Sequence, residues 1–179
     1  EIRLSLVGSE MCIRDRNDSW AFRRLFDDKL DNLGWSTIGG NAGKPAPIRY
    51  TIDLGASSKL SRYKVYQRLD YEYRHYSPKK WKIYGTDHID PANMTLDYFD
   101  GDNYHKDWVL MGEFEIIKPS GIGDQITNED KEVALAGHEF VFDLGLPPVR
   151  YLRFEQYETW SGGLEVNYRE ITFWGSDKK

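Results

Sequence analysis

Short runs of alternating residue types, several of them ended by glycine, most constrain the fold of this chain. Residues 48–54 alternate and stop at Gly55, and residues 80–84 alternate and stop at Gly85. A two-residue period places successive side chains on opposite faces of a strand, as a half-buried sheet requires. Similar runs lie at 60–67, 107–117, 139–144, 149–154 and 168–175. Six or seven such strands with no helices between them predict an all-β, antiparallel sandwich or jelly roll.

The segments between these runs are predicted to be turns and loops. Residues 21–33 contain an acidic stretch and favour a short turn over a helix. Residues 36–47 are rich in glycine, alanine and proline, which interrupt periodic structure. Residues 86–106 are polar and contain proline, and residues 118–137 form a second long loop.

The N-terminal residues 1–16 are predicted to be non-native, and residues 17–179 to form a single domain. The codons GAG-ATG-TGT-ATA-AGA-GAC encode Glu10 to Asp15 and match a transposase end sequence used in library preparation. The alternative is a genuine amphipathic N-terminal segment. If the segment is adapter-derived, Cys12, the single cysteine, carries no information about redox compartment. We then expect the chain to be the C-terminal part of a protein that has lost upstream domains and its signal segment.

Composition excludes several classes of partner. The formal net charge of −5 and the pI near 5.4 argue against nucleic acid and anionic membranes, which normally require a basic face. No apolar stretch is long enough to cross a membrane, so membrane attachment is expected only through a lost N-terminal anchor. Twelve Tyr, eight Phe and six Trp, in a chain punctuated by glycine and with few helical runs, are typical of an all-β domain.

No catalytic residues are predicted. Glutamates at 155, 158, 165 and 170 are close in sequence, but that spacing does not indicate the carboxylate separations of ~5 or ~6.5 to 9.5 Å that glycoside hydrolysis requires. The four histidines fit no zinc motif, and no nucleophile elbow or phosphate-binding glycine motif occurs. We therefore expect a non-enzymatic protein, with a glycoside hydrolase fragment as the less favoured reading.

An aromatic loop near the C-terminus is the predicted ligand site. If consecutive strands alternate in direction, the loops at 67–79 and 157–167 emerge at one end of the sandwich. An indole there offers a plane for the apolar face of a sugar ring, and neighbouring polar groups bond its hydroxyls. As an alternative, the indole folds back and caps the end of the sheet. The alternative for each neighbouring polar residue is a solvated loop position or a cap on a strand end. The candidates are Trp160, Tyr73, Arg74, His75, Tyr76 and Asn167.

The order and spacing of five motifs between Trp20 and Gly175 resemble the discoidin-like, coagulation-factor (F5/8) type C domains. The motifs are Thr51-Ile-Asp-Leu-Gly55, Leu60 to Arg68, Lys79-Lys-Trp-Lys-Ile-Tyr-Gly85, Val149-Arg-Tyr-Leu-Arg-Phe154 and Arg169-Glu-Ile-Thr-Phe-Trp-Gly175. With Lys118-Pro-Ser-Gly121, Asn128-Glu-Asp130 and Glu158-Thr-Trp160 in addition, the chain is similar to the C-terminal discoidin-like domain of uncharacterised Bacteroidetes surface lipoproteins, which are usually associated with glycan utilisation. The resemblance implies an eight-stranded jelly roll, a carbohydrate ligand, and an extracellular or outer-membrane surface location.

The resemblance also implies a structural calcium ion. Sugar-binding members often hold calcium between an early Asp-rich turn and a Glu that opens the last strand, which here match Asp28, Asp31 and Glu170. Calcium prefers several hard oxygen ligands, including carboxylates and carbonyls. This chain departs from the family pattern in one respect, because the usual Asp-Gly pair of that turn is Asp27-Asp28 here. The alternative is an ordinary solvated acidic turn.

Two further partner classes stay open beside a glycan. Other discoidin-like domains recognise proteins or phospholipids. The acidic charge of this chain weakens the lipid interpretation, because lipid binders place apolar side chains beside basic ones. The runner-up is therefore a protein-interaction or adhesion domain that contacts other surface proteins or upstream domains.

Overall fold

The structure is a computed structural model that describes residues 2–3, 21–31, 34–37, 47–121, 123–163 and 165–176. Most of the predicted non-native segment and most of the predicted 36–47 loop lie outside these residues. The described part of the predicted non-native segment is β1 (Ile2–Arg3), which pairs with Gly175 and Trp174 near the C-terminus. The division into a non-native segment and one domain stays a prediction.

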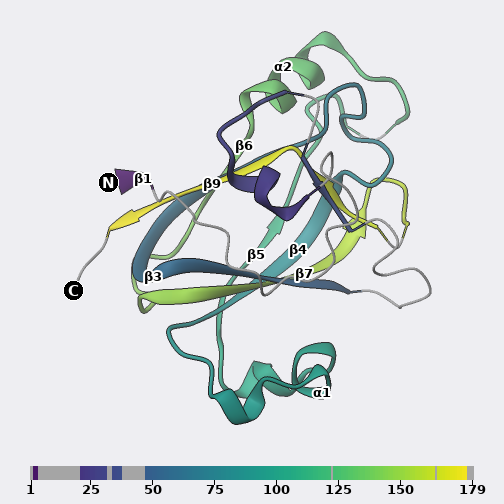
Figure 1. Ribbon diagram of the computed structural model, residues 1–179. Helices are drawn as coiled ribbons and strands as arrows, with labels where there is room; N and C mark the ends of the chain where they lie inside the picture. The colour runs from purple at the N-terminus through teal and green to yellow at the C-terminus, as the bar shows by residue number, and fades with distance from the viewer. Residues whose placement is uncertain are drawn as a thin grey trace.

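The fold is an antiparallel β-sandwich, as predicted (Figure 1). Its seven-stranded sheet has the order β1-β9-β3-β7-β4-β5, with β6 pairing β3 off this path, and every described pairing is antiparallel. A two-stranded sheet joins β2 (Trp35–Ser36) to β8 (Asn167–Tyr168). The main strands are β3 (Ile48–Tyr66), β4 (Pro78–Thr86), β5 (Val109–Glu115), β6 (His138–Val141), β7 (Val149–Thr159) and β9 (Glu170–Ser176).

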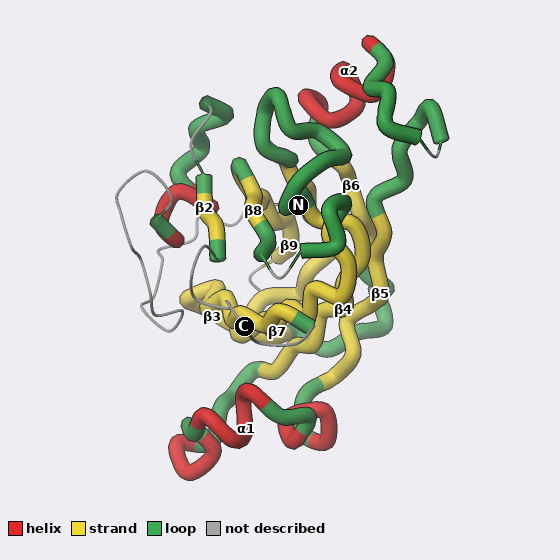
Figure 2. Tube along the Cα trace, turned by 90° about the vertical axis from the view of Figure 1, so that its right-hand side faces the viewer, coloured by secondary structure: helices red, strands yellow, loops and turns green. Residues whose placement is uncertain are grey.

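Strand β3 belongs to both layers of the sandwich. Its first part pairs with β7, and its second part pairs with β9 and β6. The register with β7 shifts between Asp53 and Ser58, where Gly55 has φ of +78°, a conformation that favours glycine. The sequence suggested that a strand ends at Gly55. Instead, the glycine allows one continuous strand to bend from one layer into the other (Figures 1 and 2).

Aromatic side chains fill the space between the layers. The ring of Tyr63 is fully buried and lies 5.0 to 5.5 Å from the ring centres of Phe140, Phe142 and Phe173. The indole N–H of buried Trp81 donates to the Tyr63 hydroxyl at 3.0 Å, so these two polar groups of the core pair with each other. The alternation seen in the sequence thus reflects strands with one face in an aromatic core.

Helices occur in three segments that were predicted as turns or loops. Helix α2 (Asn128–Ala136) begins at a capping box, in which Thr127 and Asp130 each accept a hydrogen bond from the other's backbone N–H. A 3₁₀ helix, η2 (Phe22–Phe26), lies in the first segment. The third segment holds η3 (Pro91–Asn93), α1 (Leu96–Asp100) and η4 (Asn103–Lys106). Among the described residues, no helix is long and apolar enough to span a membrane.

Residues 87–108, called the insertion below, connect β4 to β5 and build a second, smaller core. Its buried members are Ile89, Tyr98, Tyr104 and Trp108, packed against Tyr84 and Tyr151 of the sheet. In β7, Leu152 and Phe154 face the main core, so alternation turns Tyr151 toward the opposite face. The insertion therefore covers part of the outer face of the β3-β7-β4 layer (Figure 1).

Candidate functional site

The two loops that the sequence placed at one end of the sandwich lie together there. The backbone N–H of Trp160 donates to the carbonyl of Ser77 at 3.1 Å, and that of Ser161 donates to His75 at 2.7 Å. The N–H of Asn167 donates to the carbonyl of Tyr76 at 3.0 Å. We call residues 67–77 with residues 160–163 and 165–167 the loop end.

The 67–77 loop has a backbone conformation that few side chains favour. Asp70, Tyr73 and His75 have φ of 66°, 52° and 49°, in the left-handed region. Such positions cost about 1 to 3 kcal/mol each and persist only where the surroundings hold them. Here the N–H of Tyr73 donates to Gln67 Oε1 at 3.2 Å, and the hydroxyl of Ser77 donates to the carbonyl of Tyr71 at 2.9 Å. The loop is therefore held in one shape by its own side chains.

Trp160 is partly buried at the loop end and combines both predicted arrangements. Its ring packs against the main core and meets the edge of Tyr73 at 5.4 Å between ring centres. Its indole nitrogen is buried without a hydrogen-bond partner. The ring nevertheless stays partly exposed, with the ammonium group of Lys79 5.4 Å from its centre. Trp160 thus presents part of an anchored ring to solvent.

Three of the predicted rim residues reach the surface. Arg74 and His75 are exposed, and Tyr76 is partly exposed. A Cβ atom at Gly163 would lie 2.8 Å from Tyr76 Cε1, so the glycine allows Tyr76 to lie against the Trp160 turn. Arg74 Nη2 donates to the carbonyl of Asp70 at 3.5 Å, and the ring of His75 lies 4.6 Å from that of Tyr71. The loop end thus carries exposed donors and further aromatic rings in addition to Trp160.

Tyr73 and Asn167, the other two predicted rim residues, are buried. Their exposed fractions are 4% and 3%, so in this conformation they support the loop end from beneath. Burial, with the carboxylates of Asp130 and Glu72 nearby, raises the pKa of Tyr73 far above its ordinary value. Tyr73 points inward from a loop with no regular period, so sequence spacing did not reveal its direction.

His138 lies under the loop end, with its ring centre 5.7 Å from that of Tyr73. Burial lowers the pKa of His138 to about 4, so the imidazole is neutral at pH 7. Its Nε2 is buried and has no hydrogen-bond partner. Protonation of this ring would therefore place an uncompensated charge beneath the Tyr73 and Trp160 rings.

Two of the three predicted calcium ligands face a common hollow. Asp28 and Glu170 line a cavity of about 220 Å³ together with Tyr66 and Thr172. Asp28 has φ of 64°, and Glu170 is 2% exposed at the start of β9. A calcium ion in this cavity would take carboxylate oxygens from Asp28 and Glu170, and its remaining ligands would have to include backbone or hydroxyl oxygens.

The third predicted ligand, Asp31, is close to a buried cation. Burial lowers the pKa of Arg169, and the charges of Tyr66, Glu72, Asp31 and Glu170 act in the opposite direction. Within the described ranges, Asp28, Asp31 and Glu170 do not bring their ligand atoms within 4.8 Å of one another. The three-carboxylate set therefore is not assembled in this conformation.

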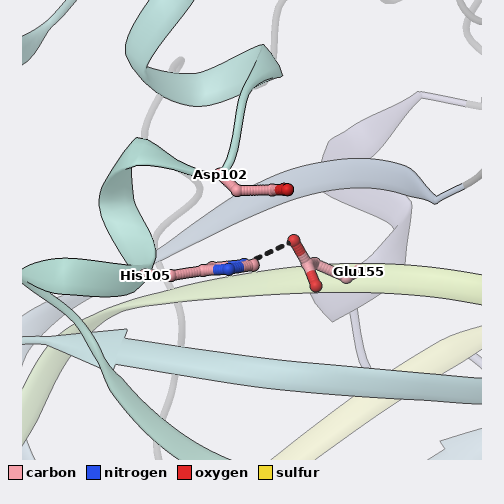
Figure 3. A group of neighbouring side chains, drawn as sticks. All are labelled: Asp102, His105 and Glu155. Atoms are coloured by element: carbon pink, nitrogen blue, oxygen red, sulfur yellow. Dashed lines mark hydrogen bonds and ion pairs between the residues drawn. The ribbon is translucent and has the colours of Figure 1, made fainter.

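One group of three metal-ligating side chains does converge within the described part of the chain: Asp102, His105 and Glu155 (Figure 3). Glu155 lies on β7 and is fully buried, whereas Asp102 and His105 come from the insertion. His105 Nε2 donates to Glu155 Oε1 at 2.9 Å, and the same oxygen accepts from Arg49 Nε at 3.1 Å. Arg49 also pairs with Asp102 at 2.6 Å. The guanidinium therefore already supplies a cation between the two carboxylates.

Two tyrosines complete the shell around Glu155. The hydroxyl of Tyr157 donates to Oε2 at 2.5 Å, and the hydroxyl of Tyr104 donates to Oε1. Burial alone would raise the pKa of Glu155, but hydrogen bonds from Tyr104, Tyr157, His105 and Arg49 outweigh it and lower the pKa to about 2. A metal ion at Oε1 would have to displace several donors. The group instead fastens the insertion to the sheet.

From the sequence, Glu155 was only one of four glutamates whose spacing did not indicate a catalytic pair. Its four donors come from positions 49, 104, 105 and 157, on β3, the insertion and β7. The signal that was present is local: Glu155 and Tyr157 are two residues apart on one strand and so share a face. The contribution of the insertion required the fold.

Solved structures define the class of this fold. The SusE-like protein BT2857 is 25% identical to this chain, with a TM-score of 0.78, 97% of this chain covered and 100% of that chain. The family 32 carbohydrate-binding module of NanJ from Clostridium perfringens, in complex with galactose, is 12% identical (TM-score 0.55; 88% and 86% covered). An F5/8 type C domain from Bacteroides fragilis is 14% identical (TM-score 0.56; 92% and 86% covered). The predicted discoidin-like sandwich is thus confirmed.

Residues 26–175 match the DUF5000 family, described as a domain of unknown function, and the chain belongs to that family. No curated protein matches the chain in sequence.

Proposed function

We propose that this chain is a non-catalytic carbohydrate-binding module whose ligand site is the loop end. The observation that carries this proposal is the partly exposed indole of Trp160, anchored on the core and set beside a strained loop that displays Arg74 and His75. The presence of a galactose complex among the solved structures with this fold supports a sugar as the ligand.

The chemistry of the loop end suits a sugar ring. The C–H face of the ring packs against the exposed part of Trp160, while Arg74 and His75 donate to its hydroxyls. The loop is held before binding, which lowers the entropic cost of ordering it. Because the site is shallow, affinity for one saccharide should be millimolar to micromolar, roughly −4 to −8 kcal/mol. Such a module acts by raising the effective concentration of a tethered partner domain at the glycan.

We further propose that the module works in a glycan-utilisation protein at the bacterial cell surface. The likeness to a SusE-like protein at 25% identity over nearly the whole chain supports this setting. In that setting the module contacts other surface proteins or upstream domains of its own chain. An outer-membrane lipoprotein remains the expected parent.

A structural calcium ion is proposed for the cavity between Asp28 and Glu170. The shared lining of that cavity supports the assignment, and Arg169 competes with it by placing a positive charge near Asp31 and Glu170. If calcium binds, it should stabilise the η2 segment against β9, as any ligand that binds only the folded state does. The ion is not needed for the sugar contact itself.

The test is a glycan array followed by calorimetry on the wild type, Trp160→Ala and Trp174→Ala. Trp174 is a matched control for the loop end, because it is also partly exposed but lies on β9 beneath the guanidinium of Arg62, where it lines the cavity proposed for calcium. We expect Trp160→Ala to weaken binding at least tenfold and Trp174→Ala to leave it within twofold. Binding that survives Trp160→Ala would refute the site. An array without any hit would favour the protein-interaction role instead.

A further inference from the structure

A second hollow lies on the insertion, away from the loop end. Its volume is about 350 Å³, and it is open to solvent. Its lining includes Asn93, Asp97, Tyr98, Asn103, Lys106 and Asp107. The insertion follows the last residue of β4, whereas the 67–77 loop precedes the first, so a whole strand separates the two regions. At about 3.3 Å per residue, that strand is roughly 26 Å long.

The hollow is built on a rigid base. Tyr98 belongs to the second core and is 8% exposed, and its hydroxyl donates to Asp107 Oδ2 at 2.8 Å. Burial and the Asp107 carboxylate raise the pKa of Tyr98 to about 12, so the hydroxyl keeps its proton and holds that carboxylate in place. The carboxylate of Asp107 is thus oriented before any ligand arrives.

Two buried side chains of β7 hold the insertion on the sheet. Glu155 accepts hydrogen bonds from Tyr104 and His105, and Arg153 donates to the carbonyl of Phe99. Both β7 residues are nearly or fully inaccessible to solvent. The hollow therefore keeps its position relative to the sandwich, which a ligand site requires.

The lining selects a chemical class by exclusion. The carboxylates of Asp97 and Asp107 disfavour an anion, and the ammonium group of Lys106 offsets one of their two negative charges toward a cation. An apolar ligand would leave these polar groups without partners. A neutral polyhydroxylated ligand satisfies all of them, because its hydroxyls donate to carboxylates and accept from the amides of Asn93 and Asn103 and from Lys106.

We propose that the insertion hollow is a second saccharide site, which takes neutral sugars and is independent of the loop end. The module is then bivalent, with two contacts at opposite ends of β4. A chain of several sugar units, or two chains, can engage both sites, so binding to a polymer gains avidity that a single sugar does not show. This inference goes beyond the proposed function, which needs only the loop end.

The test is a nuclear magnetic resonance titration with lactose and a panel of neutral oligosaccharides at millimolar concentration. Amide shifts are followed in the wild type, in Trp160→Ala and in the double variant Asn103→Ala, Lys106→Ala. Both substituted insertion residues are exposed, so the double variant should fold, as the unchanged spectrum of the sandwich will verify. We expect saccharide to shift the amides of residues 93–107 in the wild type and in Trp160→Ala. In the double variant, the affinity read from these shifts should be at least tenfold lower.

Three results would overturn the second site. If saccharide shifts occur only at the loop end and vanish in Trp160→Ala, the inference fails while the proposed function stands. If calcium chloride alone moves the 93–107 amides, the hollow is a cation site. If no saccharide in the panel moves those amides, the inference fails whatever the loop end does, because the two regions are read from separate resonances.

Discussion

Replacing Glu155 by Gln tests whether the charged network holds the insertion to the sheet. Glutamine keeps the shape of the side chain but removes its charge. Hydrogen bonds from Tyr104, Tyr157, His105 and Arg49 outweigh burial and lower the pKa of Glu155 from 4.5 to about 2. Each pKa unit corresponds to about 1.4 kcal/mol, so the ionised carboxylate contributes about 3 kcal/mol at pH 7. The side chain is fully buried, so solvent screening does not reduce this figure.

The pH dependence of the Glu155 effect has a defined sign. A lowered folded-state pKa gives stability that is present above pH 4.5 and is lost as the pH falls toward 2. In urea unfolding, the free energy of unfolding of Glu155→Gln should therefore be about 3 kcal/mol lower than that of the wild type at pH 7, and the difference should be less than half of that at pH 3. Hydrogen exchange should show faster opening of residues 87–108 in the variant.

Glu158→Gln is the matched control for this experiment. Glu158 is on the same strand, but its side chain is 46% exposed and pairs with Lys79 and Lys80. Exposed ion pairs contribute about 0 to 1 kcal/mol, so this variant should lose no more than that. A loss below about 1 kcal/mol for Glu155→Gln, or a gap that does not narrow in acid, would refute the electrostatic account.

Three further predictions concern His138, Gly34 and the cavity proposed for calcium. His138 has a pKa of about 4 in the folded protein and 6.5 in the unfolded chain, so protonation of the unfolded chain lowers the free energy of unfolding as the pH drops below 6.5. In urea titrations, the free energy of unfolding of His138→Gln should therefore fall by about 2 kcal/mol less between pH 7 and 4.5 than that of the wild type. Gly34→Ala would put a Cβ 2.1 Å from the carbonyl oxygen of Tyr168, so urea unfolding should show a loss of at least about 2 kcal/mol. Calcium should raise the melting temperature and a chelator should reverse it; a melting curve that calcium does not move would count against the Asp28 and Glu170 site.

Periodic segments of the sequence predicted the strands well. The alternation at 80–84 and 139–144 corresponds to β4 and β6, because side chains of period two must face core and solvent in turn. The same reasoning divided β3 at Gly55, since a glycine that ends a strand and a glycine that bends one look alike in sequence. The distinction depends on whether the next segment has partners in the second layer.

Helices inside the connecting segments were harder to predict. The Thr127 to Asp130 capping box was readable in the sequence, but the segment around it lacks a strong apolar stripe. In the insertion, Tyr104 and Trp108 are four residues apart, but with Tyr98 they form no sustained helical or strand period, because all three converge on a small core of their own. Aromatic residues without period in a long connection are therefore a signal of a local core.

The loop end was predicted in position but not in orientation. Strand direction brought residues 67–77 beside Trp160, and backbone hydrogen bonds show that contact. The direction of each side chain depended on three left-handed residues, whose conformation no periodic pattern encodes. Arg74 and His75 therefore point to solvent while Tyr73 between Glu72 and Arg74 turns inward.

The most direct measurement of the central claim is a crystal structure of the chain soaked with the oligosaccharide that an array selects. We expect a sugar ring packed on the exposed part of Trp160, with hydroxyls within hydrogen-bond distance of Arg74 or His75. Sugar density located elsewhere, with the loop end bare in a crystal that leaves it accessible, would contradict the proposed site.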